Sequence, residues 1–182
     1  IRAVKKYKEL GYNAEWWTHF ADTRIYQEMD IEEKYIAVSS RGRGSSQILD
    51  TLSDHYEGDI INQSGWEGKE HTEFLNSGKI VIQHSRWGEI TRRIFEGMAC
   101  GKLVITDRLA EDVELESLFI DGENIILYDD IQDCAEKIAY YSNNIMEREE
   151  IAWNGYQKVL NNHTQKQRVD LIIQQYKNFK NN

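Results

Sequence analysis

Two segments of the chain combine glycine, arginine and carboxylate side chains in spacings that suit a phosphorylated ligand. Residues 88–101 read Gly-Glu-Ile-Thr-Arg-Arg-Ile-Phe-Glu-Gly-Met-Ala-Cys-Gly, and residues 40–45 read Ser-Arg-Gly-Arg-Gly-Ser. Arginine side chains and the N–H groups at a helix N-terminus offset the charge of a diphosphate. A carboxylate suits ribose hydroxyls because its oxygens only accept hydrogen bonds. These residue types are compatible with a phosphorylated ligand.

Individual side chains of these segments can be assigned to the parts of a nucleoside diphosphate. Glu96 is the candidate for the ribose hydroxyls. Arg93, together with Arg41 and the backbone amides from Gly88 to Thr91, is the candidate for the diphosphate. Such groups would also stabilise the negative charge that develops when the diphosphate departs as a leaving group.

The same charged residues also allow a purely structural interpretation. Glu89 and Arg93, and likewise Arg92 and Glu96, are four positions apart, which is the spacing of ion pairs on a solvated helix face. Such a pair stabilises a helix by only ~0.2–0.5 kcal/mol. The charges alone leave both interpretations open.

The glycines at residues 40–45 lie between a predicted strand and a predicted helix. Gly42 and Gly44 would let a phosphate approach the backbone closely, and Arg41 adds positive charge. The spacing is neither a dinucleotide-binding fingerprint nor a P-loop, because no Gly-Lys-Ser/Thr follows. An ordinary flexible turn is the alternative.

Apolar spacing predicts that residues 88–101 form a loop followed by a helix that ends at a glycine. One arc of the helical wheel collects Ile90, Ile94, Phe95 and Met98. The opposite arc is expected to be polar and to hold Arg92, Arg93, Glu96 and Gly97. Gly101 supplies the left-handed residue that ends a helix, and the apolar run after it suits a buried parallel strand.

Further apolar runs predict the sheet that positions this helix. The runs around Tyr35, Ile60, Ile80 and Val104 alternate with helical patterns, and a further strand is expected at 124–128. Alternation of this kind predicts an α/β fold, a Rossmann-like parallel sheet with helices on both faces. The loops after the strands should then open on one edge, where such sheets bind ligands. Near the start of the chain, residues 2–10 are expected to be helical, and residues 12–17 could form another strand.

Composition limits the classes of partner. The 182 residues, of which 40% are hydrophobic, fit one globular domain. A net charge of −9 argues against nucleic acid, and no apolar run is long enough for a membrane span. The charge is uneven: residues 111–150 hold thirteen acids and two bases, whereas residues 39–108 hold ten acids and nine bases. Cys100 and Cys134 are expected to be buried free thiols, which favours the reducing cytoplasm.

Metal chemistry is not expected from this sequence. The five histidines form no pairs three or four positions apart, and no Asp-x-Asp pair follows a predicted strand. We therefore expect a nucleotide to bind without a metal ion, and no cofactor is called for.

The helix segment also resembles a known family. Its pattern G-x-x-T-x-R-x-F-E-x-x-A-x-G is similar to a signature of glycosyltransferases group 1, in the branch of spore-maturation-protein-like enzymes. The matching residues are Gly88, Thr91, Arg93, Phe95, Glu96, Ala99 and Gly101. The likeness continues through residues 121–130 and 163–168, so it covers roughly residues 28 to 180.

The resemblance implies the C-terminal, donor-binding half of a GT-B glycosyltransferase, which transfers a sugar from a nucleotide-sugar to an unknown acceptor. Trp66 would then lie near the nucleotide base, where its ring could stack, although large aromatics more often fill gaps in the packing. The donor-binding residues carried over are Arg41, Gly42, Trp66, Gly88, Glu89, Thr91, Arg93 and Glu96. Residues 1–27 would end the N-terminal lobe, 28–163 would form the nucleotide-sugar-binding domain, and 164–182 a terminal helix. The N-terminal lobe itself is expected to be missing.

The chain departs from the wider family at one position. Retaining members carry two glutamates separated by seven residues, yet the residue eight positions before Glu96 is Gly88, and Glu89 comes one residue late. A shift of one residue turns a helical side chain by about 100°. The stereochemical outcome and the catalytic residues therefore stay unknown. A nucleotide- or sugar-phosphate-binding regulator, or a silent protein-interaction module on the same scaffold, remains the alternative.

Overall fold

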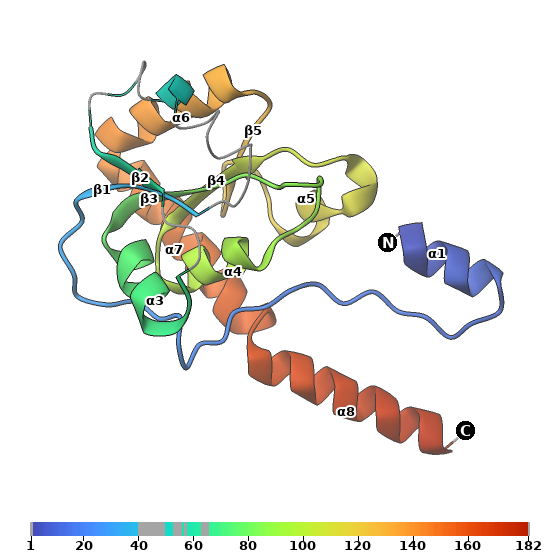
Figure 1. The fold of residues 1–182 in the computed structure, drawn as a ribbon. Coiled ribbons are helices and arrows are strands. Elements are labelled where there is room, and N and C mark those ends of the chain that lie inside the picture. Colours follow the sequence, from blue (N-terminus) through green and yellow to red (C-terminus); the bar gives the residue numbers. More distant parts are fainter. Residues whose placement is uncertain (1, 40–49, 53–55, 57, 63–65, 182) are drawn as a thin grey trace.

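The computed structural model describes residues 2–39, 50–52, 56, 58–62 and 66–181. Its centre is a five-stranded parallel sheet in the order β2-β1-β3-β4-β5 (Figure 1). The strands are β1 Tyr35–Val38, β2 Ile60–Asn62, β3 Gly78–Gln83, β4 Leu103–Asp107 and β5 Ile126–Tyr128. Every pair of neighbouring strands is parallel, so the loops after β1, β3 and β4 leave from the same edge. The predicted fold class is thereby confirmed.

Helices connect the strands and cover both faces of the sheet. Their bounds are α1 Arg2–Glu9, α3 Gly68–Asn76, α4 Arg92–Ala99, η1 Glu111–Val113, α5 Leu115–Leu118, α6 Ile131–Asn143, α7 Ile145–Asn162 and α8 Gln165–Asn181. The N-cap carboxylate of Asp130 accepts a hydrogen bond from Asp133 N, which starts α6 where the paired aspartates predict a helix.

Side chains alternate between two buried clusters, as the period of a strand requires. Ala37, Val81, Val104 and Leu127 face the cluster that α3 and α4 build. The intervening residues Ile36, Ile80, Ile82, Leu103, Ile105 and Ile126 face the cluster that contains α6 and the first turns of α7. Apolar cover on both faces explains why these strands read as continuous apolar runs.

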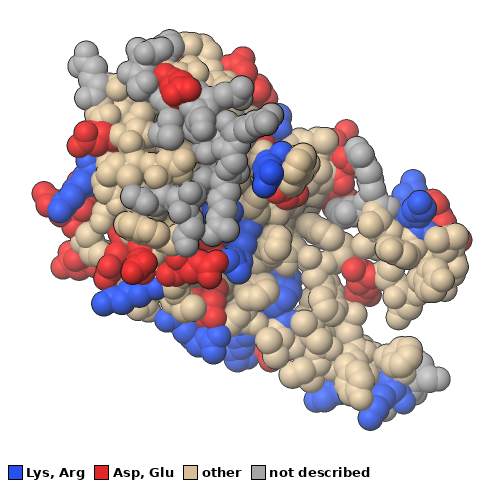
Figure 2. Space-filling view, in the orientation of Figure 1, with Lys and Arg blue, Asp and Glu red and all other residues tan. Residues whose placement is uncertain are grey.

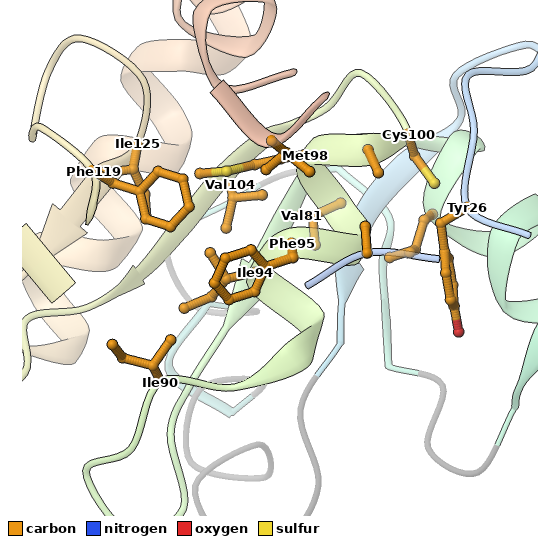
Figure 3. Close-up of a cluster of buried hydrophobic side chains, with 14 of the residues drawn as sticks. Tyr26, Val81, Ile90, Ile94, Phe95, Met98, Cys100, Val104, Phe119 and Ile125 are labelled. Atoms are coloured by element: carbon orange, nitrogen blue, oxygen red, sulfur yellow. The ribbon is translucent and has the colours of Figure 1, made fainter. Parts of the chain in front are cut away.

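Helix α4 packs directly on the middle of the sheet (Figure 3). Ile94, Phe95 and Met98 lie in the same buried cluster as Val104 of β4 and Phe119, as the apolar spacing predicts. Gly97 lets the helix approach the strands, because a Cβ there would lie 2.9 Å from Val104 Cγ2. Gly101 has φ +71°, so it supplies the predicted left-handed stop.

The first segment of the chain differs from its prediction. Helix α1 forms as expected, but residues 12–17 run as irregular extended chain without a strand partner, so the predicted strand is wrong. The adjacent tryptophans of this segment differ in environment, since Trp16 packs against the core while Trp17 is 39% exposed. The chain returns to the domain at Ala21, which forms a parallel bridge with Thr164. Helices α1 and α8 project from the sheet domain, and Figure 2 shows open space between them.

Candidate functional site

The loop between β3 and α4 is shaped by its own side chains. Gly88 adopts φ +68°, a conformation that favours glycine, and a Cβ there would meet no atom within 4 Å. One residue later, the Glu89 carboxylate accepts a hydrogen bond from the backbone N–H of Trp87 at 2.6 Å. Glu89 precedes α4, which begins at Arg92, so Glu89 and Arg93 do not lie together on the helix as the sequence analysis considered. Glu89 instead holds the turn that leads into the helix.

Asp107, at the end of β4, fastens the start of this loop to the sheet. Its carboxylate accepts hydrogen bonds from the backbone N–H of Ser85, at 2.8 Å, and from the Ser85 hydroxyl. The adjacent His84 Nδ1 lies 2.7 Å from the Tyr128 hydroxyl and 3.9 Å from the Asp107 carboxylate. The loop is therefore tied to the carboxyl ends of two neighbouring strands.

The N-terminus of α4 opens from this loop and suits an anion. Thr91 is the N-cap, but its side chain makes no capping hydrogen bond. Within the described residues, Thr91 Oγ1 is buried without a hydrogen-bond partner. The first turn carries Arg92, which is exposed, and Arg93, which is half-buried. First-turn N–H groups without a side-chain cap and two arginines make a site for negative charge.

Glu96 lies under this helix end and is buried, with 1% of its surface exposed. The sequence placed it on a solvated arc, and that placement is wrong because Tyr26 and His71 from other elements cover this side of α4. Arg92 Nε lies 2.7 Å from Glu96 Oε1, and His71 Nδ1 lies 3.8 Å from Oε2. Burial raises the pKa of Glu96, and the charges of Arg92 and Arg93 only partly oppose that rise.

A buried polar chain connects Glu96 to the end of β1. His71 Nε2 lies 3.1 Å from Ser39 Oγ, and His71 Nδ1 lies 3.2 Å from the Tyr26 hydroxyl. Ser39 directly follows β1, at the edge where the loops open. Isolated histidine, serine and tyrosine residues carry no sequence pattern that would have joined them. This series of polar contacts links Glu96 to the edge of the sheet from which the loops after β1, β3 and β4 leave.

A cavity of about 490 Å³ lies in front of the β3–α4 loop. Gly88 and Glu89 line one side, and Trp17 and His19 of the N-terminal segment line another. The volume falls in the range of small-molecule sites. Partial burial lowers the pKa of His19, and the charge of Arg92 lowers it further. A neutral imidazole therefore faces the cavity at neutral pH.

Of the predicted site residues that the structure describes, only Gly88 and Glu89 line this cavity. Arg41 and Gly42 lie outside the described residues. Trp66 is 41% exposed and packs edge-on against Phe74, with ring centroids 6.0 Å apart. It lines a separate hollow with Tyr35. Thr91, Arg93 and Glu96 follow Gly88 and Glu89 in the N-cap and first turns of α4 without lining the cavity. The predicted contact of Trp66 with a nucleotide base stays a prediction.

Arg108 is held apart from the site by neighbouring carboxylates. It pairs with Glu116 at 3.1 Å, with Asp121 at 2.7 Å and with Asp129 at 2.8 Å.

Within the described ranges, no group of three histidine, cysteine or acidic side chains is placed to hold a metal ion. Binding without a metal ion stays a prediction. None of the described helices is long and apolar enough to cross a membrane.

Comparison with known proteins agrees with the observed fold. A family model described as glycosyl transferase-like matches residues 40–174. No curated protein matches the chain. Among solved structures, the chain is similar to the C-terminal domain of a glycosyl transferase group 1 family protein (LpcC) from Francisella tularensis. That match has a TM-score of 0.62 at 18% identity and covers 78% of this chain and 97% of that one.

Two longer proteins share the same architecture. Sucrose-phosphate synthase from Thermosynechococcus elongatus matches with a TM-score of 0.67 at 11% identity, over 96% of this chain and 56% of that chain. TarM matches with a TM-score of 0.69 at 15% identity, over all of this chain and 42% of that one. The chain therefore spans about half of each of these two proteins. Identities this low establish a shared fold.

Proposed function

The chain belongs to the glycosyl transferase-like family, and from this premise we propose that it is the donor-binding half of a glycosyltransferase. In this proposal it binds a nucleotide-sugar whose sugar is moved to an acceptor. The N-terminal lobe that would complete the site is not among these residues. The spore-maturation-protein-like branch, suggested by the α4 signature, is part of the same proposal.

The observation that carries the proposal is the N-terminus of α4. Thr91 Oγ1 is buried without a partner in the described part of the chain, beside two arginines of the first turn. A diphosphate at this position would accept hydrogen bonds from the Thr91 hydroxyl and the first backbone amides. The helix dipole and Arg93 would offset its charge, including the charge that develops as the sugar leaves.

In this proposal Glu96 receives the ribose, which requires Arg92 to move. Its Oε1 has an ion pair with Arg92, whose side chain is 60% exposed, and the described residues supply no hydrogen bond to this oxygen. Rotation of Arg92 toward the diphosphate would uncover Oε1 for a ribose hydroxyl. Tyr26 and His71 would hold the carboxylate in position from the other side.

The proposal needs no metal ion at the diphosphate. Cationic side chains and the helix N-terminus take the place of a divalent ion in charge compensation. A cytoplasmic location fits this proposal, because Cys100 and Cys134 are both free and buried. The base, the sugar and the acceptor are to be assigned by experiment.

One observation favours the alternative of a binding module without turnover. The Glu89 carboxylate is engaged with the backbone of its own loop, at 2.6 Å from Trp87 N, and so is not directed by α4 toward a donor sugar. A module of this kind would bind a nucleotide or sugar phosphate and regulate a partner.

Thermal melting with a panel of UDP, GDP, ADP, TDP and CMP compounds tests the binding claim, and consumption of the best nucleotide-sugar tests transfer. We expect one nucleotide to raise the melting temperature, and we expect Arg93→Gln to remove that shift. The matched variant Arg86→Gln, which changes an arginine before the helix, should retain the shift. Absence of stabilisation by every nucleotide would contradict the proposal. Binding without consumption, when an N-terminal lobe is supplied, would favour the regulatory module.

A further inference from the structure

A second cavity, of about 260 Å³, lies at the opposite edge of the sheet from the proposed donor site. Lys79 and Leu103, from the first residues of β3 and β4, form one wall, and Arg148 and Trp153 of α7 form another. Its volume is below the range typical of drug-sized ligands, so an occupant would be a single ring with its substituents. The proposed donor binding uses none of these residues.

Two buried cations in this cavity share one carboxylate. Lys102 Nζ lies 2.8 Å from Glu33 Oε1, and Arg148 Nη2 lies 3.3 Å from Glu33 Oε2. Lys102 is 9% exposed and Arg148 is 7% exposed. Buried charges are costly unless they are paired. Glu33 balances one of these two cations. With Lys79, Glu28 and Glu149 included, the whole lining carries three cations and three carboxylates, but Lys102 and Arg148 are buried whereas Glu28 and Glu149 are exposed.

Hydrogen-bond donors also outnumber acceptors at this floor. Of the five N–H donors of the Arg148 guanidinium, the described residues give a partner only to Nη2. The Lys102 ammonium, with three N–H donors, has Glu33 as its partner. Lys79 lines the same cavity, and no ion pair or hydrogen bond joins it to another described side chain. None of these donors is among the described buried polar atoms that lack a hydrogen bond, so they are accessible and can donate to a ligand with anionic oxygen acceptors.

An aromatic wall stands beside these donors. Trp153 and Tyr156 lie on one face of α7, with ring centroids 5.7 Å apart, and Trp153 is 57% exposed. Glu28 and Glu149, both exposed, complete the rim. An indole face packs on the apolar face of a ring, and carboxylates accept hydrogen bonds from hydroxyl groups. The rim thus favours a ring that carries hydroxyls over an aromatic ring.

We propose that this cavity binds a monosaccharide unit that carries an anionic group, a carboxylate or a phosphate. The sugar ring packs on Trp153, its hydroxyls donate to the rim carboxylates, and its anion accepts from Lys79, Lys102 and Arg148. A purely structural ion-pair cluster accounts for Glu33 between the two cations. It does not account for a cavity that joins accessible donors to an exposed tryptophan.

Titration of the 182-residue chain with sodium glucuronate, glucose 6-phosphate, glucose and benzoate tests the proposal, with the Trp153 indole N–H followed by NMR. We expect glucuronate or glucose 6-phosphate to shift this signal, and whichever binds more tightly identifies the anion. Neutral glucose should bind at least tenfold more weakly, and benzoate, which lacks hydroxyls, should also bind more weakly.

Two variants at exposed or half-buried positions avoid disturbing the buried ion pairs. We expect Trp153→Ala and Lys79→Gln each to weaken sugar-acid binding about tenfold. Calorimetry reads the affinity of the tryptophan variant, since its indole signal is lost. Trp87→Ala, which removes an exposed tryptophan at the donor cavity, is the matched control and should leave this affinity unchanged. Failure of both anionic sugars to bind, glucose binding as tightly as glucuronate, or unchanged affinity in both cavity variants would each overturn the proposal. Nucleotide binding at α4 is measured in a separate titration. Failure of sugar-acid binding at this cavity can therefore be distinguished from failure of the proposed donor binding.

Discussion

Replacement of Glu96 by glutamine separates the contribution of its charge from that of its packing. The side chain is 1% exposed, and burial raises its pKa above the ordinary value of 4.5. A raised pKa means that the folded protein disfavours the carboxylate relative to the neutral acid. Glutamine keeps the shape and removes the charge. The variant therefore reports directly on the cost of the buried carboxylate.

The expected effect on stability at pH 7 is small. Glutamine loses the ion pair with Arg92, which is worth about 0.3–0.5 kcal/mol because that arginine is 60% exposed. It also relieves the burial of a charge, which acts in the opposite direction. We expect the free energy of unfolding of Glu96→Gln to lie within about 1 kcal/mol of the wild type. Phe95→Ala, which removes a ring that is 0% exposed, should instead cost ~3–5 kcal/mol.

The pH dependence of this difference has a definite sign. Between the ordinary pKa of 4.5 and the raised folded pKa of Glu96, the folded state holds a proton that the unfolded state has lost. Wild-type stability relative to Glu96→Gln should therefore increase as pH falls from 7 toward 4.5. Urea unfolding of both proteins across this range measures the difference. A wild-type advantage that shrinks on acidification would show a depressed pKa and refute the reasoning.

The same variant tests the assigned ribose contact. If Glu96 accepts hydrogen bonds from the ribose, glutamine should weaken nucleotide binding tenfold to a hundredfold, or about 1.5–3 kcal/mol. Calorimetric titration with the nucleotide that stabilises the chain best gives the affinity. If Glu96→Gln binds the nucleotide with wild-type affinity, Glu96 does not contact the ribose and its role is purely structural.

Two further predictions concern the scaffold. Burial, with the charges of Arg168 and Lys158, lowers the pKa of His163 from 6.5 to about 4, so its contribution to stability should be lost as pH falls from 6.5 toward 4. This loss amounts to roughly 2–3 kcal/mol, and His163→Gln should reduce the acid sensitivity measured by urea unfolding. Gly155→Ala should destabilise the fold by ~1–3 kcal/mol, because its Cβ would lie 2.6 Å from the Asn124 carbonyl oxygen. A melting temperature at or above that of the wild type would show that α7 moves away without cost.

The sheet could be predicted from the sequence because each strand is marked by a pattern within a few consecutive residues. Apolar runs mark all five strands, and the βαβ order fixes their parallel direction. The stop at Gly101 and the start of α6 at Asp130 follow from residue types with known backbone preferences. The strand expected at residues 12–17 does not form, because this segment pairs with no strand in the described part of the chain.

The environment of the site could not be predicted in the same way. The helical wheel placed Glu96 among polar residues, yet Tyr26 and His71 arrive from distant positions and bury it. Gly97 was likewise placed on the polar arc, although its missing side chain lets α4 approach Val104. The resemblance assigned residues 88–96 to one donor-binding region, and that assignment stays a prediction. It could not show that Glu89 bonds its own loop or that His19 and Trp17 line the cavity.

Calorimetric titration of the chain with nucleoside diphosphates, in buffer with and without EDTA, tests the central claim most directly. The proposed site compensates the diphosphate with the α4 N-terminus and its arginines. We therefore predict that at least one nucleoside diphosphate binds, with the same affinity in both buffers, and that Arg93→Gln weakens this binding at least tenfold. No measurable binding by any nucleoside diphosphate, or binding that disappears on chelation, would contradict the account.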